Sequence, residues 1–287
     1  MLWFALALAS ALAMSASDAL SKHFSRKVSD FTNTWVRFHY AAPFMLMVLA
    51  AIDIPPLDRT FWLTLAILLP LEITAWLLYL KAIRLSPLGL TIPFLGLTPV
   101  LLLVVPRLLL GEKVSLLGGL GVVLVAAGIY LLNASRTVEG WLGPLRAIRS
   151  EPGSRLMLSV AAIFSVTATL GKVLILHSSV LFVAAIYFPL LALILAPVAF
   201  ARPQVRRELM SSPGQGALIG FAFALMALSH YYAIKIAPVA YMVAVKRTSL
   251  IFATVWGWLF FQEGHLRERL LGATVIVAGV LLVALAH

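Results

Sequence analysis

The sequence contains no cysteine and few charged residues. Lysine, arginine, aspartate and glutamate make up 11% of its 287 residues, whereas hydrophobic residues make up 62%. A soluble domain usually has about 25% charged residues. The absence of cysteine excludes disulfides, thiolate chemistry and cysteine-based metal sites. The shortage of charge, with a mean hydropathy of +1.02, indicates a polytopic membrane protein.

Motifs of soluble enzymes are also absent. The sequence has no Walker loop and no HExxH motif, and its cluster of Gly118, Gly119 and Gly121 lies inside an apolar run instead of a phosphate-binding loop. The net charge of +11 does not predict nucleic-acid binding, because the cations are scattered through short loops, where they mark membrane topology. We therefore expect no enzyme activity, no cofactor and no nucleic-acid partner.

Long apolar runs define the expected fold. About 20 apolar residues form a helix that crosses the ~30 Å hydrocarbon core. Runs of this kind predict an all-α protein with ten transmembrane helices, at residues 2–20, 31–51, 61–80, 88–109, 114–133, 155–175, 179–200, 214–235, 238–261 and 266–286. Alternating ten-residue strands are absent, which argues against an outer-membrane barrel. We expect residues 1–20 to be a retained helix rather than a signal peptide, because no lysine or arginine precedes the apolar run. The expected location is a bacterial inner (cell) membrane.

The chain also repeats itself. A shift of 151 residues aligns residues 82–132 with the second half without a gap, and it places Pro87 on Pro238, Glu112 on Glu263 and Gly121 on Gly272. Apolar residues match by chance, but proline, glutamate and glycine in a fixed register rarely do. We interpret the chain as two five-helix units, residues 1–133 and 155–287, joined by the linker 134–154.

An odd number of helices per unit means that the second unit enters the membrane from the opposite side. The basic loops follow the first and third helices of the first unit, but the second and fourth helices of the second unit. This pattern indicates an inverted-topology repeat, which is common in secondary transporters. A duplicated structural or receptor-like bundle is the alternative. The positive-inside rule predicts that the basic loops and the linker are cytoplasmic and that both termini lie outside.

Several segments carry a family resemblance. They are "TWVRFHYAAP" at 34–43, "LYLKAIRLSPL" at 78–88, "LLLGEKVSLLGGLGVVLVAAGIYLL" at 108–132, "YYAIKIAPVA" at 231–240 and "LFFQEGHLRERLLGATVIVAGVLLV" at 259–283. With the two inverted copies, they resemble the EamA branch of the drug/metabolite transporter superfamily. This resemblance implies a ten-helix transporter that works by alternating access. It also implies a central cavity lined mainly by helices 1, 3, 4, 6, 8 and 9, and it does not specify a substrate.

The segment "AVKRTSLIF" at 244–252 is similar to the ninth helix of plastid sugar-phosphate translocators that exchange phosphate. In those proteins a Lys-Arg pair grips the phosphate, and the resemblance assigns that role to Lys246 and Arg247 only. The translocators also use a lysine from the fourth helix. The present chain departs from that pattern, because residues 88–109 offer Thr91 and Thr98 and no lysine.

The pair Lys246–Arg247 is also the strongest site candidate on physical grounds. A cation at the centre of a membrane helix costs about 2.5–3.5 kcal/mol on the insertion scale, so such residues usually face a cavity or a counter-ion. A buried ion pair within the bundle is the alternative. Glu72 is the expected counter-charge, and it either neutralises a cation, carries a proton or forms a structural pair. Trp76 and Tyr79 share its helix face. They and Tyr232 are candidate walls for the rest of the substrate.

Other polar residues are interpreted as structural. Arg37, at the start of its helix, is expected to be an interfacial anchor. Asp18 is expected to pair with Lys22, four residues later. Glu112 and Glu263 are expected to cap the turn into the helix that follows each of them. Small residues should allow close helix packing; they are Gly118, Gly121, Gly128, Gly272 and Gly279.

Together these features predict a secondary active transporter of a small polar, anionic metabolite. Its partners would be that substrate and membrane lipid, and its transport would be coupled to proton or counter-substrate exchange. Three alternatives stay open at this point. The protein could export amino acids or aromatic metabolites, it could flip or hold lipid headgroups, or it could be a purely structural bundle that binds nothing.

Overall fold

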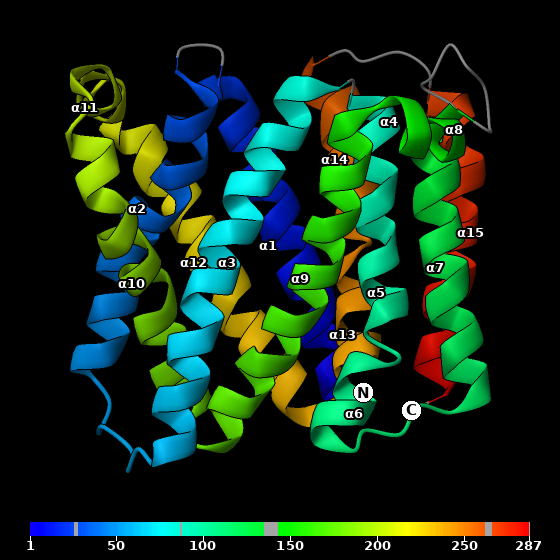
Figure 1. The fold of residues 1–287 in the computed structure, drawn as a ribbon, viewed down its shortest axis with the longest axis horizontal. Helices are drawn as coiled ribbons and strands as arrows, with labels where there is room; N and C mark the ends of the chain where they lie inside the picture. The colour runs from blue at the N-terminus through cyan, green and yellow to red at the C-terminus, as the bar shows by residue number, and fades with distance from the viewer. Residues whose placement is uncertain (26–27, 87, 135–142, 262–265, 287) are drawn as a thin grey trace.

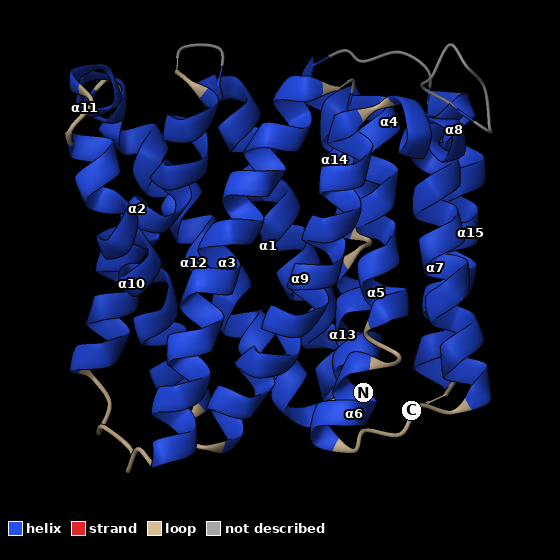
Figure 2. Ribbon diagram, in the orientation of Figure 1, coloured by secondary structure: helices blue, strands red, loops and turns tan. Residues whose placement is uncertain are grey.

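A computed structural model describes residues 1–25, 28–86, 88–134, 143–261 and 266–286 of the chain. The described part consists of helices joined by short connections (Figure 2). The elements are α1 (Leu2–Ser25), α2 (Asp30–Ala50), α3 (Arg59–Leu85), α4 (Leu88–Thr91), η1 (Ile92–Gly96), α5 (Leu97–Leu101), α6 (Val105–Leu110), α7 (Leu116–Ala134), α8 (Gly143–Ser150), α9 (Pro152–Leu176), α10 (Val180–Phe200), α11 (Pro203–Met210), α12 (Pro213–Ile236), α13 (Val239–Lys246), α14 (Ser249–Phe261) and α15 (Leu266–Leu285).

Helical structure occupies each of the predicted ranges. Seven segments of the described chain are long and apolar enough to cross a membrane: Leu2–Ser21, Arg59–Leu85, Ile92–Leu110, Pro152–Leu176, Val180–Phe200, Pro213–Ile236 and Val239–Phe260. Two shorter apolar helices, Leu116–Leu132 and Leu270–Leu285, lie side by side at one edge of the molecule as parts of α7 and α15 (Figure 1). The protein is therefore an all-helical integral membrane protein.

Helix starts follow from local sequence. Ser29, Asp58 and Ser179 stand immediately before α2, α3 and α10, and each side chain accepts a hydrogen bond from a backbone N–H of the first turn. Such caps satisfy donors that would otherwise stay unpaired at the helix start. These residues fix the helix ends at the boundaries between apolar runs and loops.

Two of the predicted helices are broken. The range 88–109 contains α4, η1, α5 and α6, with Pro93 in the 3₁₀ segment and Pro106 in the first turn of α6. Proline lacks the N–H needed inside a helix, which explains these interruptions. The range 238–261 contains α13 and α14, separated by a tight turn at Arg247–Thr248 in which Thr248 N–H bonds to Val245 O at 3.0 Å. The candidate cation pair therefore lies at a helix break.

Helix packing has a two-fold pattern. α1 packs on α12, and α3 packs on α9. The repeat pairs α1 with α9 and α3 with α12, so it converts one of these contacts into the other. α2 packs on α10, and α7 packs on α15, so each of these helices contacts its own counterpart. Both termini lie at the same end of the bundle in Figure 1. α1 begins at that end, whereas α9 begins at the opposite end beside α8. We call these the termini end and the opposite end.

Glycines allow the contact between α7 and α15. A Cβ built on Gly279 would lie 2.6 Å from Gly121 O, and one built on Gly128 would lie 2.8 Å from Gly272 O. These four glycines therefore bring two helix backbones into contact, as predicted. Gly118 differs, because its free space is taken by the ring of Tyr241.

Candidate functional site

A cavity of about 220 Å³ lies among α1, α3, α5, α9, α10, α12, α13 and α14. These elements belong to the predicted helices 1, 3, 4, 6, 8 and 9, which were expected to line the cavity, and α10 lines it in addition. Its polar lining consists of Glu72, Thr98, Thr167, His230, Lys246, Arg247 and Ser249. Its aromatic lining consists of Trp76, Phe164, Tyr187, Phe188, Phe223 and Tyr231. At ~30 Å³ per water in the liquid, this volume has room for roughly seven water molecules.

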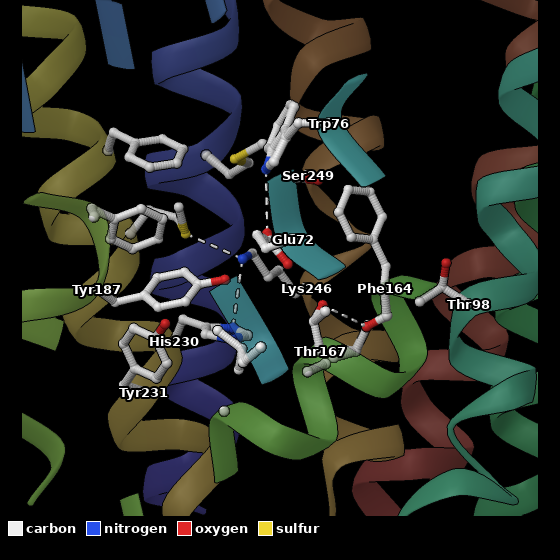
Figure 3. A pocket seen from close by; sticks show the side chains of 18 of the residues that line it. Glu72, Trp76, Thr98, Phe164, Thr167, Tyr187, His230, Tyr231, Lys246 and Ser249 are labelled. Atoms are coloured by element: carbon white, nitrogen blue, oxygen red, sulfur yellow. Dashed lines mark hydrogen bonds between the residues drawn. The ribbon is translucent and has the colours of Figure 1, made fainter. Parts of the chain in front are cut away.

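Lys246 is the last residue of α13, and its ammonium group faces the cavity (Figure 3). Nζ lies 3.1 Å from Met226 Sδ and 3.5 Å from His230 Nδ1. A thioether and an imidazole are weak partners for a full charge. No carboxylate lies within 4.0 Å of Nζ among the described residues, so this cation has no direct ion pair there.

Arg247 follows in the turn and also lines the cavity. Its Nε is buried and has no hydrogen-bond partner in the described part of the chain. The same is true of the hydroxyl of Thr98, whose side chain is 2% exposed. Buried polar groups without partners are rare in proteins, so Arg247 Nε and the Thr98 hydroxyl are both available to bind a polar group in the cavity.

The helix break also places Ser249 at the cavity. α14 begins at Ser249, which lines the cavity, and it runs for 13 residues. The first N–H groups of α14 are paired across the turn, because Leu250 N–H bonds to Arg247 O and the N–H groups of Ile251 and Phe252 bond to Thr248 O. Lys246 and Arg247 make this wall of the cavity electropositive.

Glu72 is the carboxylate of the cavity. Its Oε1 accepts a hydrogen bond from Trp76 Nε1 at 3.2 Å, so both residues lie on the same wall (Figure 3). Trp76 packs edge-on against Phe164, with ring centres 5.9 Å apart. Because Glu72 and Lys246 make no ion pair within 4.0 Å, a polar group could bind both without first breaking a salt bridge.

The other two candidate wall residues lie outside the cavity lining. Tyr79 packs on Trp76, with ring centres 5.8 Å apart, and so supports that wall from behind. Tyr232 is 40% exposed, and its neighbours His230 and Tyr231 line the cavity in its place. The structure thus brings Lys246, Arg247, Glu72 and Trp76 together.

Sequence reasoning did not select several lining residues, among them Thr167, Tyr187 and Ser249. A signal existed for Ser249, because the shift of 151 places it on Thr98. Both members of this pair face the cavity. Thr167 and Tyr187 carry no comparable signal in the sequence.

Two structural interpretations need correction. Arg37, expected to be an interfacial anchor, instead pairs with Asp18, at 2.6 Å between a guanidinium nitrogen and Oδ1, because α1 and α2 face each other there. The side chain of Lys22 lies outside the described residues, so the pairing of Asp18 with Lys22 stays a prediction. Arg37 is therefore held within the bundle. Glu112 does not cap the next helix, α7. Its Oε2 accepts the backbone N–H of Val239 at the start of α13, because the fold brings that helix beside the loop. Glu263 lies outside the described residues.

Apolar helices surround a polar cavity, and broken helices and unpaired donors lie at its centre. This is the architecture of a membrane transporter. The family model of the EamA-like transporter family matches residues 1–134 and 152–285. The chain therefore belongs to the EamA-like transporter family, within the drug/metabolite transporter superfamily.

Other comparisons support the fold only. A solved structure titled "Crystal structure of protein" is similar over 99% of this chain and 97% of its own, with a TM-score of 0.74 and 16% identity. No curated protein matches the sequence. The functional details therefore have to come from the cavity.

Proposed function

We propose that this protein is a secondary active transporter that moves a small, polar, anionic metabolite by alternating access. The observation that carries this proposal is the placement of Lys246 and Arg247 at a cavity without a carboxylate partner within 4.0 Å among the described residues. Two cations at membrane depth would cost about 5–7 kcal/mol on the insertion scale without compensation. A bound anion supplies that compensation.

The proposal includes the finer architecture. Ten membrane spans form two inverted five-helix repeats, residues 1–133 and 155–287, with residues 134–154 as the linker. The exchange of the α1–α12 and α3–α9 contacts supports this arrangement. We place the protein in a bacterial inner membrane, where spans are helical, with the basic loops in the cytoplasm. Coupling to a proton or to a counter-substrate would supply the energy, with Glu72 as the group that exchanges a proton.

Thermal unfolding of the purified protein tests whether the cavity selects anions. The probes are inorganic phosphate, acetate and benzoate, with phenylethylamine as a cation and benzyl alcohol as a neutral control. A ligand at about 100 times its Kd stabilises the folded state by about 2.7 kcal/mol. We expect the anions to raise the Tm of the wild type and to have little effect on the K246Q/R247Q variant.

The matched control is the variant K235Q/R107Q, because it removes the same two charges at exposed positions outside the cavity. It should respond to anions like the wild type. Stabilisation by phenylethylamine or benzyl alcohol alone would refute the anionic substrate. Uptake of the stabilising anion into proteoliposomes tests transport itself. Movement of labelled lipid without solute uptake would instead favour a lipid flippase.

A second candidate function is export of amino acids or aromatic carboxylates. The aromatic wall favours it, since Trp76, Phe164, Phe188 and Phe223 all line the cavity. The lining also contains both charges that a zwitterion needs, with Glu72 facing an ammonium group and the cation pair facing a carboxylate. Competition between phosphate and phenylalanine in the same thermal assay separates the two functions.

A further inference from the structure

A partly buried polar network joins the two halves of the chain at the termini end. Lys172 on α9 donates to Glu112 Oε1 at 2.5 Å and to Ala237 O at 2.7 Å. Glu112 belongs to the loop between α6 and α7, and its Oε2 accepts the N–H of Val239 at 2.9 Å. One carboxylate of the first half thus holds an ammonium group and a helix start of the second half.

A second contact reinforces the first. The hydroxyl of Tyr241 on α13 accepts the N–H of Ser115 at 3.1 Å and lies 3.1 Å from the Ser115 hydroxyl. Tyr241 is 2% exposed, and its ring fills the space beside Gly118. The loop of the first half is therefore bound to α13 at two points. We call the contacts of Glu112, Lys172, Val239, Ser115 and Tyr241 the clamp.

The clamp lies next to the cavity. Gly171, the neighbour of Lys172, lines the cavity, and so does Val243, one turn along α13 from Val239. α13 has only eight residues and ends at Lys246. The helix that the clamp holds at its start therefore carries the substrate-facing cation at its end.

We propose that the clamp is the gate that closes the cavity toward the termini end, and that Glu112 is the positioning residue on which closure depends. The proposal rests on the transport function argued above. Inverted repeats expose a central site by rocking one half against the other. A charged pair suits such a gate, because loss of either partner leaves the other charge uncompensated while the gate is closed, whereas both members are readily hydrated once water enters.

The absence of native cysteine makes the gate testable with introduced pairs. In the variant E112C/K172C, a short bis-methanethiosulfonate reagent would join the two halves covalently in the closed arrangement. We expect the cross-linked protein to keep its anion-dependent Tm shift, to lose proteoliposome uptake, and to regain uptake when the link is reduced. Uptake at the unlinked rate after complete cross-linking would overturn the gate. If anions did not raise the Tm of the wild type at all, the transport proposal itself would instead be overturned.

Accessibility gives a second test. G171C places a thiol on the cavity wall, where a Cβ has room, since its nearest neighbour is Tyr231 Cε1 at 3.8 Å. A cysteine at Leu2 marks the termini end. The variant E112Q keeps an acceptor for the N–H of Val239 but removes the negative charge that faces Lys172. Charge-assisted hydrogen bonds are stronger than neutral ones, so this change weakens the clamp. We therefore expect an impermeant thiol reagent added from the termini end to label G171C about tenfold faster in E112Q.

The control is E151Q, because Glu151 bonds to Ser86 at the opposite end of the bundle. It should leave termini-end labelling of G171C unchanged. A loss of structure would expose thiols from both ends, so labelling of S249C from the opposite end is measured in parallel. It should not rise with E112Q, because a protein that opens more often toward the termini end opens less often toward the opposite end. Equal termini-end labelling in E112Q and wild-type backgrounds would overturn the gate.

Discussion

The contact between α7 and α15 makes a sharp prediction for Gly279. An added Cβ would lie 2.6 Å from Gly121 O and 2.7 Å from Val125 N, both of which are backbone atoms. Backbone atoms cannot turn aside as the end of a side chain can. Because carbon atoms pack at about 3.5–4.0 Å, Gly279→Ala would force the two helices apart by about 1 Å.

The magnitude follows from a comparison with Gly119. Overpacking a close contact typically costs about 1–3 kcal/mol. Gly119 lies on the same helix as Gly121, but a Cβ there would meet nothing within 4 Å. Gly119→Ala should therefore be neutral or stabilising by up to about 1 kcal/mol, the helix preference of alanine over glycine. We expect the two variants to differ by about 2 kcal/mol.

Thermal unfolding in one detergent measures this difference. With a shift of about 2–4 °C per kcal/mol for chains of about this size, Gly279→Ala should unfold about 4–8 °C below Gly119→Ala. A third variant, Gly128→Ala, should resemble Gly279→Ala, since its Cβ would also meet backbone atoms on the partner helix. Equal Tm values for all three variants would refute the reasoning that backbone contact holds these helices together.

Two further predictions concern single side chains. The N–H of Phe61, which donates to Asp58, and the contact with His177 lower the pKa of Asp58 below its ordinary 3.8, so this stabilisation is complete above 3.8 and is lost as the pH falls through the lower folded-state value. Asp58→Ala should therefore lower Tm at neutral pH, and its difference from the wild type should shrink as the pH falls below 3.8. Exposed Asp53→Ala should leave Tm at neutral pH unchanged, and a pH-independent effect of Asp58→Ala would contradict the reasoning. Thr98→Val removes a buried hydroxyl that has no partner among the described residues, so the Tm measured without ligand should stay unchanged or rise. The same variant should bind anions about fivefold more weakly, whereas Thr98→Ser, which keeps the hydroxyl, should bind like the wild type. Unchanged anion affinity in Thr98→Val, measured by titration of the Tm shift, would remove Thr98 from the site.

Much of the helical framework could be predicted from the sequence, because membrane thickness and hydropathy together set where helices can lie. The breaks could not all be predicted. Prolines mark the interruption at 88–110, but the turn at Arg247–Thr248 contains neither proline nor glycine. The unusual feature of that turn is the charge of Lys246 and Arg247. Charge alone does not predict where a helix breaks, because its effect on the backbone depends on whether a cavity lies beside it.

The site was only partly predictable for a related reason. Lys246, Arg247 and Glu72 stand out because charge is rare in this chain, and all three line the cavity. Tyr231 and Tyr232 are both tyrosines, and adjacent helix positions point about 100° apart. Only the packing of α12 decides that Tyr231 faces inward while Tyr232 is exposed. Hydroxyls such as Thr167 are equally ambiguous, because similar residues occur along most of the helices.

The internal repeat reproduces only part of the clamp. The shift of 151 places Tyr241 on Leu90 and Ser115 on Leu266, so the hydroxyl contact at the termini end has no counterpart in the sequence at the opposite end. One neutral hydrogen bond contributes about 0.5–1.5 kcal/mol, which is roughly a two- to twelvefold bias between two states. A duplicated fold provides two arrangements of nearly equal energy. On the gate proposed above, we therefore expect this contact, which was not duplicated, to bias the empty transporter toward closure at the termini end.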